Sequence, residues 1–233
     1  MKYTYLLIDL FTILIPFIFS FYPKPGFYHT WKALLPSIII TGIFFVLCDS
    51  YFTSIGVWGF NHHYLTSAMI GNLPIEEVLF FVCIPYSCLF TFHCLDAVIK
   101  VNLSKVAINA LSLVFVLITI SIAIYFHDKE YTFFTFSLLS ALLIIANYVL
   151  KVTWLTKFYL IYAILLIPFL IVNGLLTGTW LNAPVVWYNN NELIGLRILT
   201  IPIEDVFYGM ALILMNLLIY LHLISKRRRI SVT

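Results

Sequence analysis

The sequence predicts an all-α integral membrane protein with about seven transmembrane helices, built as two parallel three-helix repeats joined by one linking helix. Its 233 residues are 63% hydrophobic and only 10% charged, a composition far more apolar than that of an ordinary soluble domain. In addition, a short acidic motif occurs twice, each time at the start of an apolar segment. Most of the chain is therefore expected to contact lipid.

The chain contains seven apolar segments, separated by polar or charged residues. A helix needs roughly 20 residues to cross the hydrocarbon layer, and each segment is long enough to do so. The alternating polarity typical of a membrane barrel is absent, since segments such as residues 138–146 are apolar all round. We therefore expect transmembrane helices near residues 3–22, 34–53, 73–95, 105–126, 131–150, 158–177 and 200–223.

The first of these segments has the position of a signal peptide but lacks its other features. It contains Asp9 and Pro16, and it ends in Tyr22-Pro23-Lys24-Pro25 without a cleavage site of the small-x-small type. We therefore interpret it as a helix of the folded protein.

Basic residues are distributed unequally among the loops. With the carboxyl terminus in the cytoplasm, ten of the 13 Lys and Arg residues lie on the cytoplasmic side, and only Lys2, Lys129 and Arg197 lie opposite. The positive-inside rule then predicts an amino terminus outside and a carboxyl terminus in the cytoplasm, and we expect a bacterial cytoplasmic membrane. The basic tail at residues 226–229 is interpreted as a topology anchor and not as a nucleic-acid site.

The third and seventh segments open with nearly the same residues. Residues 73–80 read LPIEEVLF and residues 201–208 read IPIEDVFY. Upstream, VWGFN at residues 57–61 matches VWYNN at residues 186–190, with a slippage of one residue. This similarity indicates an internal duplication.

The duplication predicts how the chain is divided. We expect a first repeat of three transmembrane helices at residues 1–96, a linking transmembrane helix within 97–130, and a second three-helix repeat at 131–233 that includes the basic tail. Because the linking helix adds one crossing, the repeats run parallel and not inverted. Both acidic motifs then face the outer interface, where we expect them to line one central cavity.

Each motif places two adjacent acids, Glu76-Glu77 and Glu204-Asp205, at the start of an apolar helix. A cap is one interpretation, because acids after a helix-initiating proline interact well with the unpaired amides of the first turn. Acid-base chemistry is the other, since close and desolvated carboxyl groups can leave one acid protonated and another ionised. The duplication, in a chain with only ten acids, favours the chemical interpretation.

Four aromatic residues, Phe80, Phe81, Phe207 and Tyr208, follow these acids by about one helical turn. Most aromatic residues of such a chain pack together or form an interfacial belt. The ring faces of these four are instead expected to bind substrate and to stabilise a carbocation, by about 1 to 2 kcal/mol each in a dry site.

Two further acids lie inside apolar segments, where an ionisable residue suggests function by default. Asp49 is near the outer end of the second segment, level with the motifs, and joins the predicted site. Asp9 lies in the first segment and stays outside that site.

The two acidic motifs each begin with proline; they are Pro74-Ile75-Glu76-Glu77 and Pro202-Ile203-Glu204-Asp205. Through these motifs and the three-helix repeats, the sequence resembles the membrane-integral, non-flavin lycopene cyclase family over nearly its full length. It resembles the fused tandem form of the heterodimeric-type lycopene beta-cyclase. The resemblance implies an isomerase of carotenoid biosynthesis that closes the linear ends of lycopene into beta-ionone rings, through gamma-carotene to beta-carotene. It also implies that Glu76 and Glu204 are the leading catalytic residues, with Glu77 and Asp205 as partners; which acid donates and which is the base stays open.

We expect no cofactor and no metal. The G-x-G-x-x-G fingerprint of a dinucleotide-binding fold is absent, and neither the His62-His63 pair nor the four cysteines match a metal framework. The expected partners are a lipophilic carotenoid and membrane lipid. Self-association, the number and type of rings formed, and the carotenoid chain length stay open.

Two functions without cyclisation can be compared with these patterns. A retinal protein needs a lysine in its seventh span, and residues 200–223 contain none. A membrane protein that binds or transports a carotenoid or isoprenoid is the remaining alternative. Transporters favour acids in the middle of the bilayer on broken helices, whereas the acids of this chain open intact apolar segments.

Overall fold

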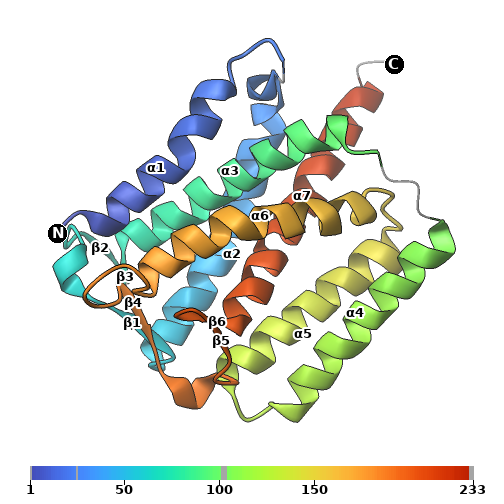
Figure 1. Ribbon diagram of the computed structural model, residues 1–233. Helices are drawn as coiled ribbons and strands as arrows, with labels where there is room; N and C mark the ends of the chain where they lie inside the picture. The colour runs from blue at the N-terminus through green and yellow to red at the C-terminus, as the bar shows by residue number, and fades with distance from the viewer. Residues whose placement is uncertain (1, 25, 101–103, 231–233) are drawn as a thin grey trace. The chain divides into compact units, whose positions relative to one another are not determined.

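The computed structural model describes residues 2–24, 26–100 and 104–230. Their secondary structure consists almost entirely of helices, with a few short strands (Figure 1), which confirms the predicted all-α membrane class. Residues 101–103 of the predicted linking segment and residues 231–233 at the end of the predicted basic tail lie outside the described residues.

The helices follow the apolar segments of the sequence to within a few residues, except that the last one runs further into the basic tail. They are α1 (Thr4–Phe19), α2 (Trp31–Ser54), α3 (Ile75–Val98), α4 (Lys105–Tyr125), α5 (Glu130–Ile144), α6 (Leu155–Leu176) and α7 (Ile203–Ile230). A π-helical turn, Ile145–Val149, continues α5, and short 3-10 turns occur at Phe27–Thr30, His62–Tyr64 and Asn190–Glu192. The strands are β1 (Trp58–Phe60), β2 (Met69–Ile70), β3 (Leu73–Pro74), β4 (Val186–Tyr188), β5 (Arg197–Ile198) and β6 (Ile201–Pro202).

Six helical segments of the described chain are long and apolar enough to cross a membrane. They are Phe27–Ser54, Ile75–Val98, Val106–Tyr125, Glu130–Val149, Leu155–Leu176 and Ile203–Arg227. Large apolar side chains such as Leu47, Ile118 and Ile124 remain exposed on them, as lipid contact requires and water would not favour. The chain is therefore a multi-pass membrane protein.

The first helix is shorter than predicted. With 16 residues, α1 falls below the roughly 20 residues of a full span. It stops at Phe19 because the chain then turns, and Gly26 adopts a left-handed conformation with φ of 62° just before the next helical turn. The predicted span at residues 3–22 thus includes residues of this turn.

The chain divides into two compact units. The first contains the described residues of Met1–Tyr51, His62–Ala97 and Leu212–Thr233, and the second contains Phe52–Asn61 and those of Val98–Ala211. Helices α2 and α7 therefore contribute to both units. The acidic motif at the start of α3 belongs to the first unit, and the motif at the start of α7 belongs to the second.

Within the second unit, α4 and α5 lie side by side (Figure 1). The hydroxyl of Ser140 on α5 donates to the hydroxyl oxygen of Thr119 on α4 at 2.7 Å. Both residues are buried, so the two helices are joined by a polar contact away from water, where such contacts help to fix helix pairs in a membrane.

The second unit also contains an antiparallel pair formed by β1 and β4, which gives the register of the duplication. The Asn61 N–H donates to the Val185 carbonyl at 2.8 Å, and the Asn189 N–H donates to the Val57 carbonyl at 2.8 Å. This two-fold pattern makes Val57 equivalent to Val185 and Asn61 to Asn189, with the same separation in sequence as the two acidic motifs. The predicted slippage of one residue is therefore wrong, because it aligned two tryptophans that are not equivalent.

A short antiparallel hairpin leads into each acidic motif. Strands β2 and β3 precede α3, and strands β5 and β6 precede α7. The hairpin tips contain Gly71 with φ of 63° and Leu199 with φ of 58°, both in the left-handed region that tight turns use. Each hairpin thereby fixes where its helix begins, and hence where the acids of the first turn lie.

Candidate functional site

Glu76 occupies the first turn of α3 and is fully buried, with 0% of its surface exposed. The backbone N–H of Thr66, in the loop before β2, donates to Glu76 Oε1 at 2.6 Å. The other carboxyl oxygen, Oε2, is buried and has no hydrogen-bond partner among the described residues. The loop thus binds Oε1 of the Glu76 carboxyl group, whereas Oε2 remains available to accept or give a hydrogen bond.

Glu77 connects three helices of the first unit. The Tyr5 hydroxyl on α1 donates to Glu77 Oε2 at 2.8 Å, and the Asp49 carboxyl group on α2 shares a hydrogen bond with Glu77. Both acids are buried. Two carboxyl groups can share a hydrogen bond only if one of them carries a proton, so this arrangement suits a pair that holds one proton between its two acids.

The hairpin before Glu76 is tied to the end of α2. The Ser50 hydroxyl donates to Asn72 Oδ1 at 2.7 Å, and the Asn72 amide donates to the Ser50 carbonyl at 2.7 Å. Because Ser50 follows Asp49 directly, this double contact sets the position of Asp49 relative to the first turn of α3.

The second unit repeats the arrangement around Glu204, which is also 0% exposed. Glu204 Oε1 accepts from the Ile194 backbone N–H at 2.6 Å and from the Thr132 hydroxyl at 2.7 Å. Its Oε2 is buried without a hydrogen-bond partner among the described residues, as is Oε2 of Glu76. Ile194 stands in the same relation to Glu204 as Thr66 does to Glu76, ten residues before it.

Asp205 takes the place of Glu77 but has different partners. The Tyr131 hydroxyl on α5 donates to Oδ1 at 2.8 Å, and the Tyr188 hydroxyl on β4 donates to Oδ2 at 2.9 Å. Two phenols thus bind the two oxygens of one carboxyl group, an arrangement that favours a localised negative charge.

The two units differ in a polar residue that lies close to the hairpin before each acidic motif. In the second unit, the hydroxyls of Thr177 and Thr179 each share a hydrogen bond of 2.6 Å with the Thr200 hydroxyl. By the register of the duplication, Thr200 corresponds to Asn72 and Thr177 corresponds to Asp49. The first unit therefore has a carboxyl group at a position where the second unit has a hydroxyl.

Two of the four predicted aromatic residues lie next to the tyrosines that bind the acids, and the other two pack against phenylalanines. Phe80 meets the Tyr5 ring edge-on at 6.4 Å between centroids, and Tyr208 meets the Tyr131 ring at 5.5 Å. Phe81 packs in the core against Phe45, at 6.0 Å between ring centroids. Phe207 contacts Phe136 on α5 at 4.8 Å between centroids.

Aromatic rings surround Tyr131 on several sides in the second unit. Its ring centroid lies 5.0 Å from that of Trp58, 5.7 Å from that of Phe52 and 6.3 Å from that of Tyr188. The hydroxyl that binds Asp205 is therefore enclosed by ring faces and edges, an environment suited to a transient cation.

Three tyrosines were missed by the sequence analysis, namely Tyr5, Tyr131 and Tyr188. Tyr5 and Tyr131 lie near the starts of α1 and α5, the first helices of the two repeats. An alignment of these two helices would have paired the tyrosines, whereas the motif comparison began only at the loop before α3. The phenol of each reaches an acid more than 70 residues away in sequence.

We expect that removing one of these phenols destabilises the fold. In Tyr131→Phe, Asp205 Oδ1 loses its donor, and a buried polar group without a partner costs about 1 to 3 kcal/mol. Thermal unfolding in detergent measures the effect. Tyr125→Phe, on an exposed side chain of α4, is the matched control and should leave the midpoint unchanged; equal midpoints for both variants would contradict the hydrogen bond.

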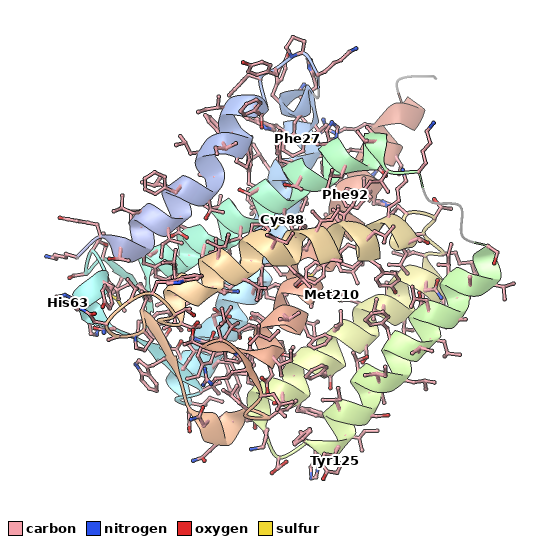
Figure 2. All side chains as sticks on the ribbon, in the orientation of Figure 1. Phe27, His63, Cys88, Phe92, Tyr125 and Met210 are labelled. Atoms are coloured by element: carbon pink, nitrogen blue, oxygen red, sulfur yellow. The ribbon has the colours of Figure 1, made fainter. Side chains whose placement is uncertain are left out.

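Potential metal ligands do not gather in the described part of the chain, which contains no group of three or more His, Cys, Asp and Glu residues suited to a metal ion. In the first unit, Figure 2 shows Cys88 on α3 well away from His63, which lies in the turn before β2. All four cysteines, Cys48, Cys83, Cys88 and Cys94, are free thiols.

Comparison with known protein families gives a match over most of the chain. A family model described as lycopene cyclase matches residues 2–95 and 128–223. No curated protein and no solved structure gives a significant match. The two matched segments each contain one acidic motif with its buried glutamate, Glu76 or Glu204, and they leave out most of the segment between the repeats.

Proposed function

Because the chain belongs to the lycopene cyclase family, we propose that it is a lycopene beta-cyclase, which converts lycopene through gamma-carotene to beta-carotene. Family membership makes it a carotenoid cyclase with a lipophilic substrate; the beta ring and the formation of two rings are the proposal. The observation that supports it best is a buried glutamate in each unit, Glu76 and Glu204, with one carboxyl oxygen held and the other available.

The reaction needs only proton transfers and one new carbon-carbon bond per ring. A carboxylic acid gives its proton to the terminal double bond of lycopene and leaves a tertiary carbocation. A neighbouring double bond attacks the cation, so that the ring bond forms and the positive charge moves into the ring. A carboxylate then removes a ring proton, and the electron pair of that C–H bond becomes the new ring double bond. The product is an isomer of the substrate.

We assign the leading catalytic roles to Glu76 and Glu204. Their Oε2 atoms have no partner among the described residues, while oxygens of Glu77 and Asp205 accept hydrogen bonds from tyrosines. Glu77, Asp205 and Asp49 then act as proton-sharing partners of these two acids. Within each unit, the glutamate and its partner acid, Glu77 or Asp205, divide the roles of proton donor and base in either order, and a positioned acid or base typically contributes 10²- to 10⁴-fold to rate.

The four aromatic residues near the acids are proposed to stabilise the cationic intermediate. Phe80 and Tyr208 contact the tyrosines that bind the motif acids, and Phe81 and Phe207 lie in the same helical turns. Ring faces turned toward a carbocation in a water-free site would each contribute about 1 to 2 kcal/mol. The apolar chain of the carotenoid would approach from the bilayer.

The membrane arrangement is part of the proposal. We place the amino terminus outside and the carboxyl terminus in the cytoplasm of a bacterial membrane, because ten of the 13 basic residues then lie on the cytoplasmic side. The repeats are assigned to residues 1–96 and 131–233, with the linking segment 97–130, which contains α4, between them. The matched segments at 2–95 and 128–223 support this division.

A bacterial host that accumulates lycopene tests the function directly. With the wild-type chain in its membrane, we expect beta-carotene as the main pigment by chromatography, with gamma-carotene as the one-ring intermediate. Unchanged lycopene, despite normal amounts of protein in the membrane, would contradict the proposal. Lycopene that stayed bound to the purified protein without reacting would instead favour a carotenoid-binding or transport function.

A further inference from the structure

Asp9 is a buried carboxyl group that no step of the proposed cyclisation uses. It lies on α1 one helical turn after Tyr5, the residue that donates to Glu77. Asp9 is 0% exposed, and neither of its carboxyl oxygens has a hydrogen-bond partner among the described residues. An isolated carboxylate in such a place would cost several kcal/mol, so the resting form of Asp9 carries its proton.

The groups around Asp9 come from α1 and α3 of the first unit. Asp9 interacts electrostatically with Glu77 most strongly and with Glu76 less, and it also acts on the Tyr5 phenol and the Cys83 thiol. Among the described residues, the groups that interact with Asp9 are other acids and not Lys or Arg. Asp49, on α2, meets the same cluster through its hydrogen bond with Glu77. The Tyr5 hydroxyl donates to Glu77 at 2.8 Å and the Ser87 hydroxyl donates to the Thr12 carbonyl at 3.0 Å, so α1 lies along α3 on both sides of Asp9. Asp9 is therefore buried near the acids that exchange protons in the proposed reaction.

The second unit shows that packing does not require an acid at the position that Asp9 occupies in the first unit. Thr135 follows Tyr131 by one helical turn, as Asp9 follows Tyr5, and it is likewise 0% exposed. Its hydroxyl, too, is buried without a hydrogen-bond partner. A small polar side chain suffices for the fold at this place, whereas only the first unit has an ionisable one.

We propose that Asp9 returns protons between Glu77 and Glu76, so that the acids of the first unit are reset after each ring closure. This inference depends on the proposed cyclase function. Asp9 contacts no reacting atom of the substrate and acts only through the two glutamates.

The proton transfers balance without any further reactant. After one ring has formed, the donor is a carboxylate and the base has become a carboxylic acid. The Asp9 O–H bond breaks and its proton moves to the donor carboxylate. The acid that took the ring proton then gives a proton to the Asp9 carboxylate. All three groups return to their starting states, and no net proton is consumed.

Substitution of Asp9 tests this inference in the full-length protein in membranes. Asp9→Asn keeps the shape but carries no transferable proton, and we expect the cyclisation rate to fall about 10- to 100-fold. Asp9→Ala leaves a small space, and added formate should restore its rate several-fold, whereas Asp9→Asn should not respond because the amide fills that space. Thr135→Val, the matched change in the second unit, should keep the rate within about two-fold.

A second readout does not depend on activity. The infrared C=O stretching band of a protonated carboxyl group should weaken in Asp9→Asn, and a band identical to that of the wild-type protein would overturn the inference. Wild-type turnover in Asp9→Asn would also overturn it, as would slow variants that formate does not restore and that unfold at lower temperature. A wild-type chain that makes no cyclised carotenoid would contradict the proposed function itself, which separates the two failures.

Discussion

Replacing Glu204 with glutamine is expected to lower cyclisation at least about 100-fold without unfolding the protein. The glutamine oxygen can still accept from the Ile194 N–H at 2.6 Å and from the Thr132 hydroxyl at 2.7 Å. The nitrogen replaces Oε2, which has no hydrogen-bond partner to lose. Only the ability to give or take a proton disappears, and that ability is worth 10²- to 10⁴-fold in rate. Product formation at equal membrane expression measures the effect.

The same substitution at Glu130 is the matched control. Glu130 begins α5 with an exposed side chain, so Glu130→Gln should leave the rate within about two-fold of wild type. Glu204→Gln with more than a tenth of the wild-type rate would remove Glu204 from the reacting acids. Glu76→Gln extends the comparison to the first unit, where a similar loss is expected because Glu76 has the same burial and the same available oxygen.

The fold class was predictable because membrane helices depend on the length and composition of single segments. Each long apolar segment became a helix, and the acids of both motifs lie in the first turns of α3 and α7 as predicted. These features are local in sequence, so a single sequence is enough to predict them. The full burial of Glu76 and Glu204 is a result of the structure, since the sequence placed them only near the outer interface.

The partners of the acids were not predictable, because they depend on how helices are rotated against one another. The chain has 15 tyrosines, and nothing in the local pattern distinguishes Tyr5 or Tyr131 from those that face lipid. Their hydrogen bonds to Glu77 and Asp205 appear only when α1 packs against α3 and α5 packs against α7. The predicted alignment of β1 with β4 was wrong for a related reason. It matched two tryptophans by side-chain identity, whereas equivalent positions in paired strands are set by the backbone hydrogen bonds.

A second large effect is expected from Gly178→Ala, which should lower the free energy of unfolding by about 2 to 4 kcal/mol. Gly178 follows the end of α6 with φ of 98°, a conformation that costs a residue with a side chain about 1 to 2 kcal/mol. An added Cβ would also lie 3.1 Å from both Cα and N of Pro184. Backbone atoms cannot rotate away as the end of a side chain can, and such overpacking typically costs about 1 to 3 kcal/mol.

Gly178 also matters for the acids, because its neighbours Thr177 and Thr179 both bind Thr200 at 2.6 Å in the hairpin that precedes Glu204. A shift at Gly178 should therefore reduce cyclisation several-fold as well as stability. Gly195→Ala separates backbone strain from crowding: its φ is 89°, but nothing lies within 4 Å of an added Cβ, so we expect a loss of only about 1 to 2 kcal/mol. Thermal unfolding in detergent compares the two variants, and equal losses would show that the contact with Pro184 does not constrain the end of α6.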